Sequence, residues 1–248
     1  MSKRAQQRKE MRQKPTGGGV KRLYLILGGV ALIGVVAAVY TTGSTVFSNA
    51  VTEPVDLGDL SDEELVNLAY GSEMGDPDAA ISVVEFGDYQ CPGCAMFASG
   101  VKPLIELNLV GTGRAKFVFY DLPLVGIHSN SFLASRASHC AGDQGGYWEY
   151  HNTLFDNQFS WAASGDPVGN FVGYARALGM DDGAFRDCLN SDRHADRVSA
   201  NLRLASALSL TSTPSVLVSR GSGAARRLPD TSYATIENAV EALTEGEP

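Results

Sequence analysis

Two cysteines separated by two residues, Cys91 and Cys94, are the side chains with the clearest potential for chemistry. Thiols at this spacing can take part in thiol-disulfide exchange, form a structural disulfide or supply half of a metal site. The sequence holds no second pair at this spacing, and its other two cysteines and four histidines show no zinc-ligand spacing. We therefore expect no metal, and no cofactor other than the redox-active disulfide that Cys91 and Cys94 can form.

The segments around the pair favour exchange chemistry. The apolar run Ile81–Phe86 predicts a buried strand, and after a short loop a helical pattern with a kink at Pro103 begins at Cys91. A free cysteine has a pKa of about 8.5, but the unpaired amides and the positive dipole end of a helix start stabilise a thiolate at Cys91. Pro92 stands where a missing amide costs nothing. One turn later, Cys94 is expected to face inward and to act as the resolving thiol.

The other periodic segments predict an α/β protein with a helical insertion. Strands are expected at 116–120 and 215–218, with a short partner strand near 226–228. Five helical patterns fill 129–207, which is more than one crossover needs, so this segment is interpreted as an inserted helical subdomain. The expected organisation is a basic tail at 1–22, a transmembrane anchor at 23–42, a linker with a short helix at 43–75, the first part of the fold at 76–128, the insertion at 129–207 and the second part at 208–248.

The N-terminal residues predict that the protein is located at a membrane. Residues 1–22 carry eight Lys or Arg and one acid, and the uncharged run 23–40 is 18 residues long, so that as a helix of roughly 27 Å it just spans a bilayer. We expect an uncleaved single-pass anchor with the N-terminus in the cytoplasm and the body outside it, although Ser48–Ala50 also offers a signal-peptidase site. After residue 22, 12 basic residues stand against 27 acidic ones, which argues against nucleic-acid binding.

The sequence VEFGDYQCPGC at 84–94 resembles the active-site strand and turn of DsbA-like disulfide oxidoreductases. The similarity covers residues 81 to about 160, including His128 and Cys140, and returns at Thr211–Val218. It implies a thioredoxin fold interrupted by a helical domain, and the activity of a protein disulfide oxidoreductase. Unlike the most oxidising members of that family, this chain has Pro-Gly, without a histidine, between its cysteines.

The same resemblance implies roles for residues outside the pair. Glu85 matches an acidic residue beneath the active site that relays protons from the buried cysteine, and the alternative is a partly solvated strand residue. Pro214 matches a proline whose preceding peptide bond is cis and lies against the cysteine pair, where the backbone of Thr213 binds an extended substrate. We assign Pro92 and Gly93 to the same substrate-binding surface.

The two remaining cysteines are expected to form a structural disulfide. If Cys91 pairs with Cys94, then Cys140 and Cys188 are left as partners, and both fall on predicted helices of the insertion in an oxidising compartment. The alternative is two separately buried free thiols that fill a helical core.

Together these features predict a dithiol oxidase that introduces disulfides into unfolded or extended, cysteine-containing exported proteins. Its expected redox partner is a quinone-linked membrane oxidoreductase. A reductase or isomerase would use the same residues, but isomerases of this superfamily usually carry a dimerisation domain, for which 41–75 is too short. A third possibility is a non-enzymatic, tethered module that binds copper or extended peptides.

Overall fold

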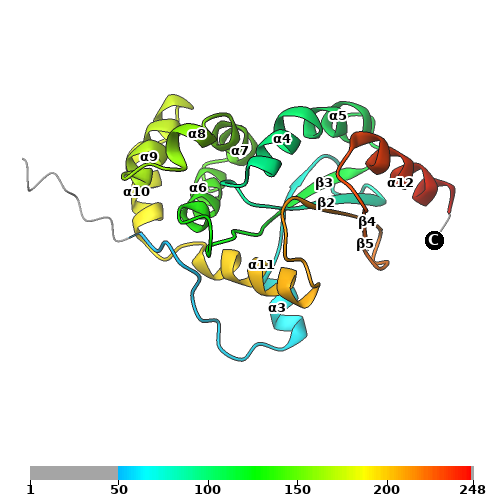
Figure 1. Ribbon diagram of the computed structural model, residues 1–248, viewed down its shortest axis with the longest axis horizontal. Helices are drawn as coiled ribbons and strands as arrows, with labels where there is room; N and C mark the ends of the chain where they lie inside the picture. Colours follow the sequence, from blue (N-terminus) through cyan, green and yellow to red (C-terminus); the bar gives the residue numbers. More distant parts are fainter. Residues whose placement is uncertain (1–49, 247–248) are drawn as a thin grey trace, which may run out of the picture. The chain divides into compact units, whose positions relative to one another are not determined.

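The part of the chain that the structure describes is residues 50–246 of a computed structural model, drawn in Figure 1. The basic tail expected at 1–22 and the membrane anchor expected at 23–42 lie outside the described residues. Between residues 50 and 246, the structure has no helix that is both long and apolar enough to cross a bilayer.

A five-stranded mixed sheet with the strand order β1-β3-β2-β4-β5 forms the centre of the described part. Its central strand, β2, runs parallel to β3 and antiparallel to β4, while β1 and β5 are antiparallel edge strands. Five of the seven residues of β2 are buried, as expected for a strand covered on both faces. The strands are β1 (Ser72–Met74), β2 (Ile81–Gly87), β3 (Lys116–Asp121), β4 (Ser215–Arg220) and β5 (Arg226–Arg227).

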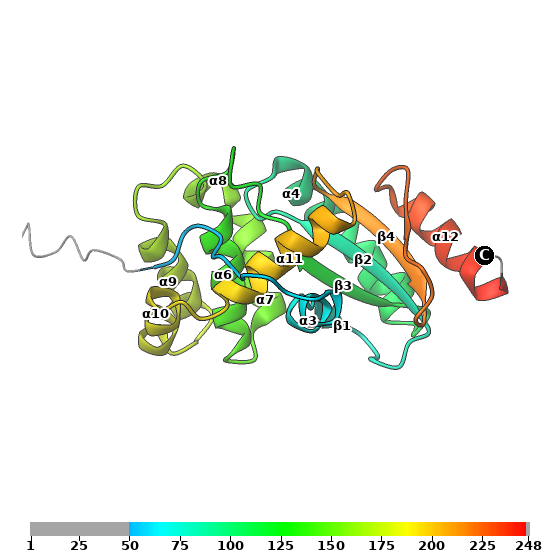
Figure 2. The ribbon, with the colours of Figure 1, turned by 90° about the horizontal axis from the view of Figure 1, so that it is seen from below.

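Helices cover both faces of this sheet. In Figure 1, α4, α5 and α12 lie on one side of the strands, α11 and α3 lie on the other, and α6 to α10 gather beside the sheet. Figure 2 shows α11 crossing the sheet face, where it packs against β3 and α3. The helices are α3 (Asp62–Leu68), α4 (Pro92–Gly100), α5 (Lys102–Ile105), the π-helix η1 (Glu106–Val110), α6 (Ser131–Gly142), α7 (Tyr147–Asp156), α8 (Gln158–Trp161), α9 (Pro167–Ala177), α10 (Asp182–Asn190), α11 (Ala195–Ala207) and α12 (Tyr233–Glu245).

The predicted α/β class with a helical insertion is therefore confirmed, but two short elements differ from the expectation. Residues 43–75 were expected to hold only a linker and a short helix, yet Ser72–Met74 pair with β3 as the edge strand β1. Three residues are too few to show an alternating pattern, which is why the sequence does not reveal this strand. At the expected kink beside Pro103 the helix divides at Val101 into α4 and α5, and it ends as a π-helix.

One apolar core runs without interruption from the sheet into the insertion. It joins sheet residues such as Phe117 to Cys94 of α4, Tyr150 of α7 and Phe185 of α10, all of them fully buried. The insertion therefore shares its main core with the sheet. The helices that carry Cys140 and Cys188 pack into the same core as Cys94 of the active site.

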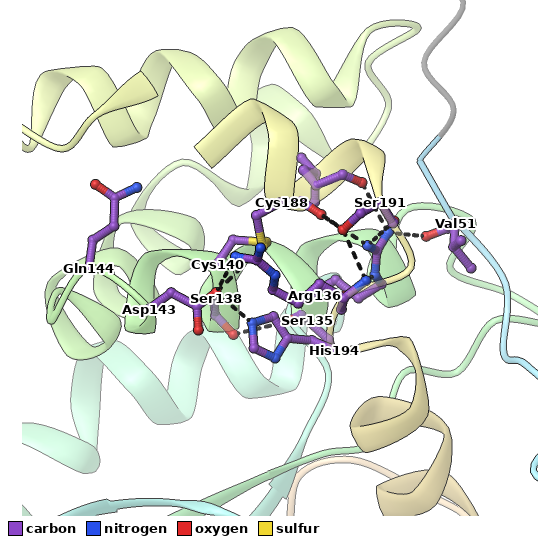
Figure 3. Close-up of a disulfide and its surroundings, with 12 residues drawn as sticks. Val51, Ser135, Arg136, Ser138, Cys140, Asp143, Gln144, Cys188, Ser191 and His194 are labelled. Carbon is purple, nitrogen blue, oxygen red and sulfur yellow. Dashed lines mark hydrogen bonds and ion pairs between the residues drawn. A yellow bond between two sulfur atoms is a disulfide. The ribbon is translucent and has the colours of Figure 1, made fainter. Parts of the chain in front are cut away.

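The second cysteine pair lies at a junction between α6 and α10 (Figure 3). Cys140 and Cys188 are joined in a disulfide with Cα atoms 5.9 Å apart, so the expected pairing is present. Next to it the fully buried Arg136 donates to the backbone carbonyls of Val51, Cys188 and Leu189, and also to those of two residues just after α10. Burial lowers the pKa of Arg136 to about 10, which still leaves it charged at neutral pH. A cation at the carbonyl end of α10 also offsets the helix dipole.

Arg136→Met should destabilise the described fold strongly. The methionine fills part of the space but removes the five hydrogen bonds of the guanidinium group, and each buried carbonyl left without a donor costs about 1–3 kcal/mol. We expect the free energy of unfolding in denaturant to fall by roughly 3 kcal/mol or more. The matched control is Arg203→Met, because Arg203 is exposed and donates to one carbonyl, that of Gly58. Equal losses in the two variants would contradict a special role for the Arg136 hydrogen bonds.

Candidate active site

The two cysteines lie where the central strand passes into a helix. After β2 ends at Gly87, three residues lead to Cys91, which is the N-cap of α4 with Pro92 in its first turn. Cys91 keeps 9% of its surface exposed, whereas Cys94 is fully buried, and both are free thiols. The structure thus places one thiol at the helix start, nearly buried, and a fully buried one a turn later, the order expected from the sequence.

The loop just before β4 packs against this pair. The peptide bond between Thr213 and Pro214 is cis. The carbonyl of Thr213 accepts a hydrogen bond from the Cys91 thiol at 3.5 Å. A Cβ placed on Gly93 would come within 3.2 Å of Pro214 Cδ, so this close approach favours glycine between the cysteines. The residues assigned to substrate binding from the sequence, 92, 93 and 213, therefore meet at one surface.

The two thiols have opposite acidities. The pKa of Cys91 is lowered to about 5, chiefly by a hydrogen bond from the Cys94 thiol, and the backbone amides of Gly93 and Cys94 add to this effect against the opposing effect of burial. Burial raises the pKa of Cys94 far above its usual value, and its hydrogen bond to the Cys91 sulfur raises it further. At neutral pH the sulfur of Cys91 is accordingly a thiolate and that of Cys94 a thiol.

Glu85 lies beneath the pair on β2. Its side chain is fully buried, and neither carboxyl oxygen has a hydrogen-bond partner. Burial raises the pKa of Glu85 to about 8, while the charge of the buried Lys102 opposes the shift. Glu85 also contributes to the raised pKa of Cys94, so the two groups feel each other's charge. The alternative of a partly solvated strand residue does not fit this burial.

Further residues that sequence reasoning missed hold the active-site loop in place. Gln158 Nε2 donates to the carbonyls of Tyr89 and Cys91 at 2.7 and 3.0 Å. The carboxylate of Asp88 accepts the amide of Leu124 and contacts His128 Nδ1 at 2.7 Å. No spacing rule links residues 67 apart, so Gln158 is recognised only once the fold is known.

The cysteine pair of the active site does not belong to any cluster of three metal-binding side chains in the part of the chain that the structure describes. Within residues 50–246, one such cluster occurs, at Cys140 and Cys188 with His194.

We expect the acidity of Cys91 to depend on the side chain at position 94 more than on any other single group. Cys94→Ala removes the hydrogen-bond donor and should raise the pKa of Cys91 above its value of about 5. Cys94→Ser keeps a donor and should raise it less. The pH dependence of the alkylation rate of Cys91 measures both values. Equal pKa values in the two variants would show that the helix amides, rather than the neighbouring thiol, set the acidity.

Relatives of the chain fall into two groups. Residues 69–238 match the model of a family described as thioredoxin. Disulfide bond formation protein D of Bacillus subtilis is 28% identical over an alignment of 151 residues that covers 58% of this chain and 66% of that protein. A protein named Na(+)/H(+) antiporter NhaA 1 from Salinispora arenicola is 32% identical over 144 residues, again 58% of this chain but 21% of that protein. The chain thus spans about a fifth of the antiporter and just under two thirds of the Bacillus protein.

Solved structures show the same fold. BdbD from Bacillus subtilis, in its oxidised form, superposes with a TM-score of 0.63 at 24% identity, covering 72% of this chain and 97% of that one. Alpha-DsbA1 of Wolbachia pipientis also superposes with a TM-score of 0.63, at 21% identity, covering 77% and 95%. These superpositions confirm the expected thioredoxin-like fold with its helical insertion. Because the family model spans more than half of its residues, the chain belongs to the thioredoxin family.

Proposed function

We propose that the chain is a thiol-disulfide oxidoreductase that acts as a dithiol oxidase, introducing disulfides into exported proteins through Cys91 and Cys94. The observation that carries this proposal is the pairing of an acidic thiol at the helix start with a fully buried thiol of very low acidity. Such a pair makes Cys91 a good leaving group and stabilises the dithiol form, which raises the reduction potential by about 30 mV for each tenfold gain in acidity. The name of the Bacillus relative, disulfide bond formation protein D, supports the same activity.

The exchange proceeds through a mixed disulfide. A substrate thiolate attacks Cys91 Sγ of the oxidised pair, the bond between the two sulfurs breaks, and Cys94 leaves with the electron pair. Because a thiolate is strongly disfavoured at Cys94, the departing sulfur takes up a proton. Glu85 is the proposed donor, since it is a buried acid whose charge affects the pKa of Cys94. A second substrate thiolate then attacks the substrate sulfur of the mixed disulfide, which releases Cys91 as a stable thiolate and leaves the substrate oxidised.

The cis-proline loop is the proposed substrate surface. The Thr213 carbonyl lies 3.5 Å from Cys91 Sγ, so an extended chain that pairs with this backbone brings its own sulfur to the same place. Backbone pairing selects for extended conformation rather than for sequence, which suits unfolded cysteine-containing chains as substrates.

We further propose that the body lies outside the cytoplasm on a single-pass anchor, and that a quinone-linked membrane oxidoreductase reoxidises the pair.

The antiporter relatives do not change this proposal. Their name describes proteins of which the matched segment makes up 21%. Na⁺ and H⁺ transport is therefore not carried over to this chain.

Glu85→Gln should change the pH dependence of stability in a definite direction. The folded pKa of about 8 lies above the ordinary value of 4.5, so the folded chain holds this proton more tightly than the unfolded chain. The resulting stabilisation is complete below about pH 4.5 and is lost as the pH rises through about 8. With Cys91 and Cys94 reduced, the wild type should therefore lose stability over this range relative to Glu85→Gln in denaturant unfolding.

The same variant tests the proton step. Glu85→Gln should slow the oxidation of a dithiol peptide at neutral pH by about tenfold or more, since general acid catalysis is lost. The matched control is Glu73→Gln, because Glu73 is on the edge strand β1, where its side chain is half exposed and bound to Lys116. If Glu85→Gln and Glu73→Gln behave alike in both measurements, Glu85 has no part in proton transfer.

Mixed-disulfide trapping and the reduction potential test the proposed oxidase directly. Cys94→Ser should accumulate mixed disulfides between Cys91 and exported cysteine-containing proteins, and Cys91→Ser should accumulate none. Equilibration of the Cys91–Cys94 couple with glutathione should give a potential more oxidising than that of thioredoxin, which is about −270 mV. A potential at or below the thioredoxin value would instead favour a reductase that uses the same residues.

A further inference from the structure

The disulfide of the insertion lies among side chains that bind metal ions well. The sulfurs of Cys140 and Cys188 and a ring nitrogen of His194 all lie within 4.8 Å of one another. The carboxylate oxygen Oδ2 of Asp143 lies 3.8 Å from Cys188 Sγ and 3.0 Å from His194 Nε2. Figure 3 shows these side chains converging on one point from α6, from α10 and from the residue just before α11.

We propose that reduction of the Cys140–Cys188 disulfide converts this cluster into a tetrahedral Zn²⁺ site formed by Cys140, Cys188, His194 and Asp143. The reductant is a dithiol: it delivers two electrons and two protons to the sulfurs, the bond between them breaks, and the dithiol becomes a disulfide. Zn²⁺ then replaces the two thiol protons, which are released to solvent.

The types and separations of the ligands suit this ion. Thiolate sulfur, imidazole nitrogen and carboxylate oxygen are the three kinds of ligand that Zn²⁺ takes in proteins, at roughly 2.0–2.3 Å. Tetrahedral geometry at these lengths places ligand atoms roughly 3.3–3.8 Å apart. Asp143 Oδ2 lies 3.0 Å from His194 Nε2 and 3.8 Å from Cys188 Sγ, and the ligand atoms of Cys140, Cys188 and His194 lie within 4.8 Å of one another. Asp143 does not belong to that group of three, so its carboxylate has to move toward Cys140 Sγ when the metal binds. The sulfurs move apart once their bond is broken.

The surroundings also match the charge of the complex. Zn²⁺ with two thiolates, one carboxylate and a neutral imidazole carries a net charge of −1. Arg193 Nη1 lies 3.1 Å from Asp143 Oδ2, and the buried Arg136 donates to the carbonyl of Cys188, so two guanidinium groups lie beside the proposed anion. The N-terminus of α11 follows directly after His194, and its dipole favours negative charge as well.

The conformation of His194 and the solvent exposure of two ligands favour metal binding. His194 is the N-cap residue of α11 and has a left-handed conformation with a φ of 64°, which is uncommon outside glycine, and its ring nitrogen Nε2 contacts Asp143 rather than the helix. The side chains of His194 and Asp143 are 16% and 35% exposed, and both line a cavity of about 360 Å³ beside β1. An ion can therefore reach the buried sulfurs through these two ligands. In the reduced chain the metal links α6 to α10, as the disulfide does in the oxidised chain.

Cobalt binding by a variant that lacks the active-site thiols tests the proposal. In the full chain, Cys91→Ser with Cys94→Ser leaves Cys140 and Cys188 as the two cysteines of the sequence. After anaerobic reduction with a phosphine, titration with Co²⁺ should give one bound ion per chain, with thiolate-to-cobalt charge-transfer absorption and the visible bands of tetrahedral Co²⁺. Zn²⁺ should displace it, and the unreduced protein should show none of these bands.

Single substitutions in the same background identify the other ligands. His194→Ala and Asp143→Ala should each weaken Co²⁺ binding by more than about tenfold, because even residues that only orient metal ligands contribute about 10–100-fold. The matched control is Asp187→Ala, which removes an exposed carboxylate next to Cys188 in sequence and should leave the affinity within about twofold. Failure of the reduced chain to bind Co²⁺, or equal affinity in all three variants, would overturn the proposal.

Circular dichroism decides the remaining case, in which reduction unfolds the chain. Zn²⁺ should then restore the helical signal in the variant that lacks Cys91 and Cys94, because metal binding is coupled to folding. It should not restore the signal when His194→Ala is added to that variant. A reduced chain that Zn²⁺ fails to refold also overturns the proposal.

Discussion

The antiparallel register between β2 and β4 is the constraint on which the active site depends. It pairs Phe86, near the end of one strand, with Ser215 at the start of the other. The chain that leaves β2 therefore reaches Cys91 at the same edge of the sheet where Thr213 and Pro214 enter β4. A slip of one residue would turn the side chains of a strand to the opposite face and would move Glu85 away from the face that carries α4 and the cysteine pair. Strand pairing thus positions both the nucleophile and the loop against it.

The opposite acidities of the two cysteines arise from one difference in position on α4. Cys91 caps the helix and receives amide and thiol hydrogen bonds, whereas Cys94 has entered the core, where a charge is poorly solvated. Glu85 is buried below them without a hydrogen-bond partner, so its carboxylate and a Cys94 thiolate disfavour each other. A proton that leaves one of these groups is therefore held most easily by the other. Lys102 limits the effect on Glu85, because its buried charge opposes the rise in pKa.

Local patterns in the sequence predict the elements that carry the cysteines, and less of what surrounds them. The buried strand at 81–86, the helix starting at Cys91 and the kink beside Pro103 each follow from the periodicity or chemistry of neighbouring residues. The cis bond before Pro214 is implied by family resemblance alone, since no local rule requires it. Residues that meet only through tertiary packing escape such rules. Gln158 reaches the active-site loop from the four-residue helix α8, a segment too short to show periodicity.

The surroundings of the second cysteine pair are also hard to predict from local sequence patterns. Pairing Cys140 with Cys188 could be predicted by elimination, but the position of His194 beside them depends on a sharp left-handed turn between α10 and α11. Zinc-ligand spacing in sequence was the reason to expect no metal site, and that rule applies to ligands carried by short local loops. Here the proposed ligands lie within or at the ends of α6, α10 and α11, and α6 and α10 pack into one core. Because that core also contains Cys94 and the aromatic residues beneath the active site, the crosslink between α6 and α10 stabilises the same packing that buries the resolving thiol.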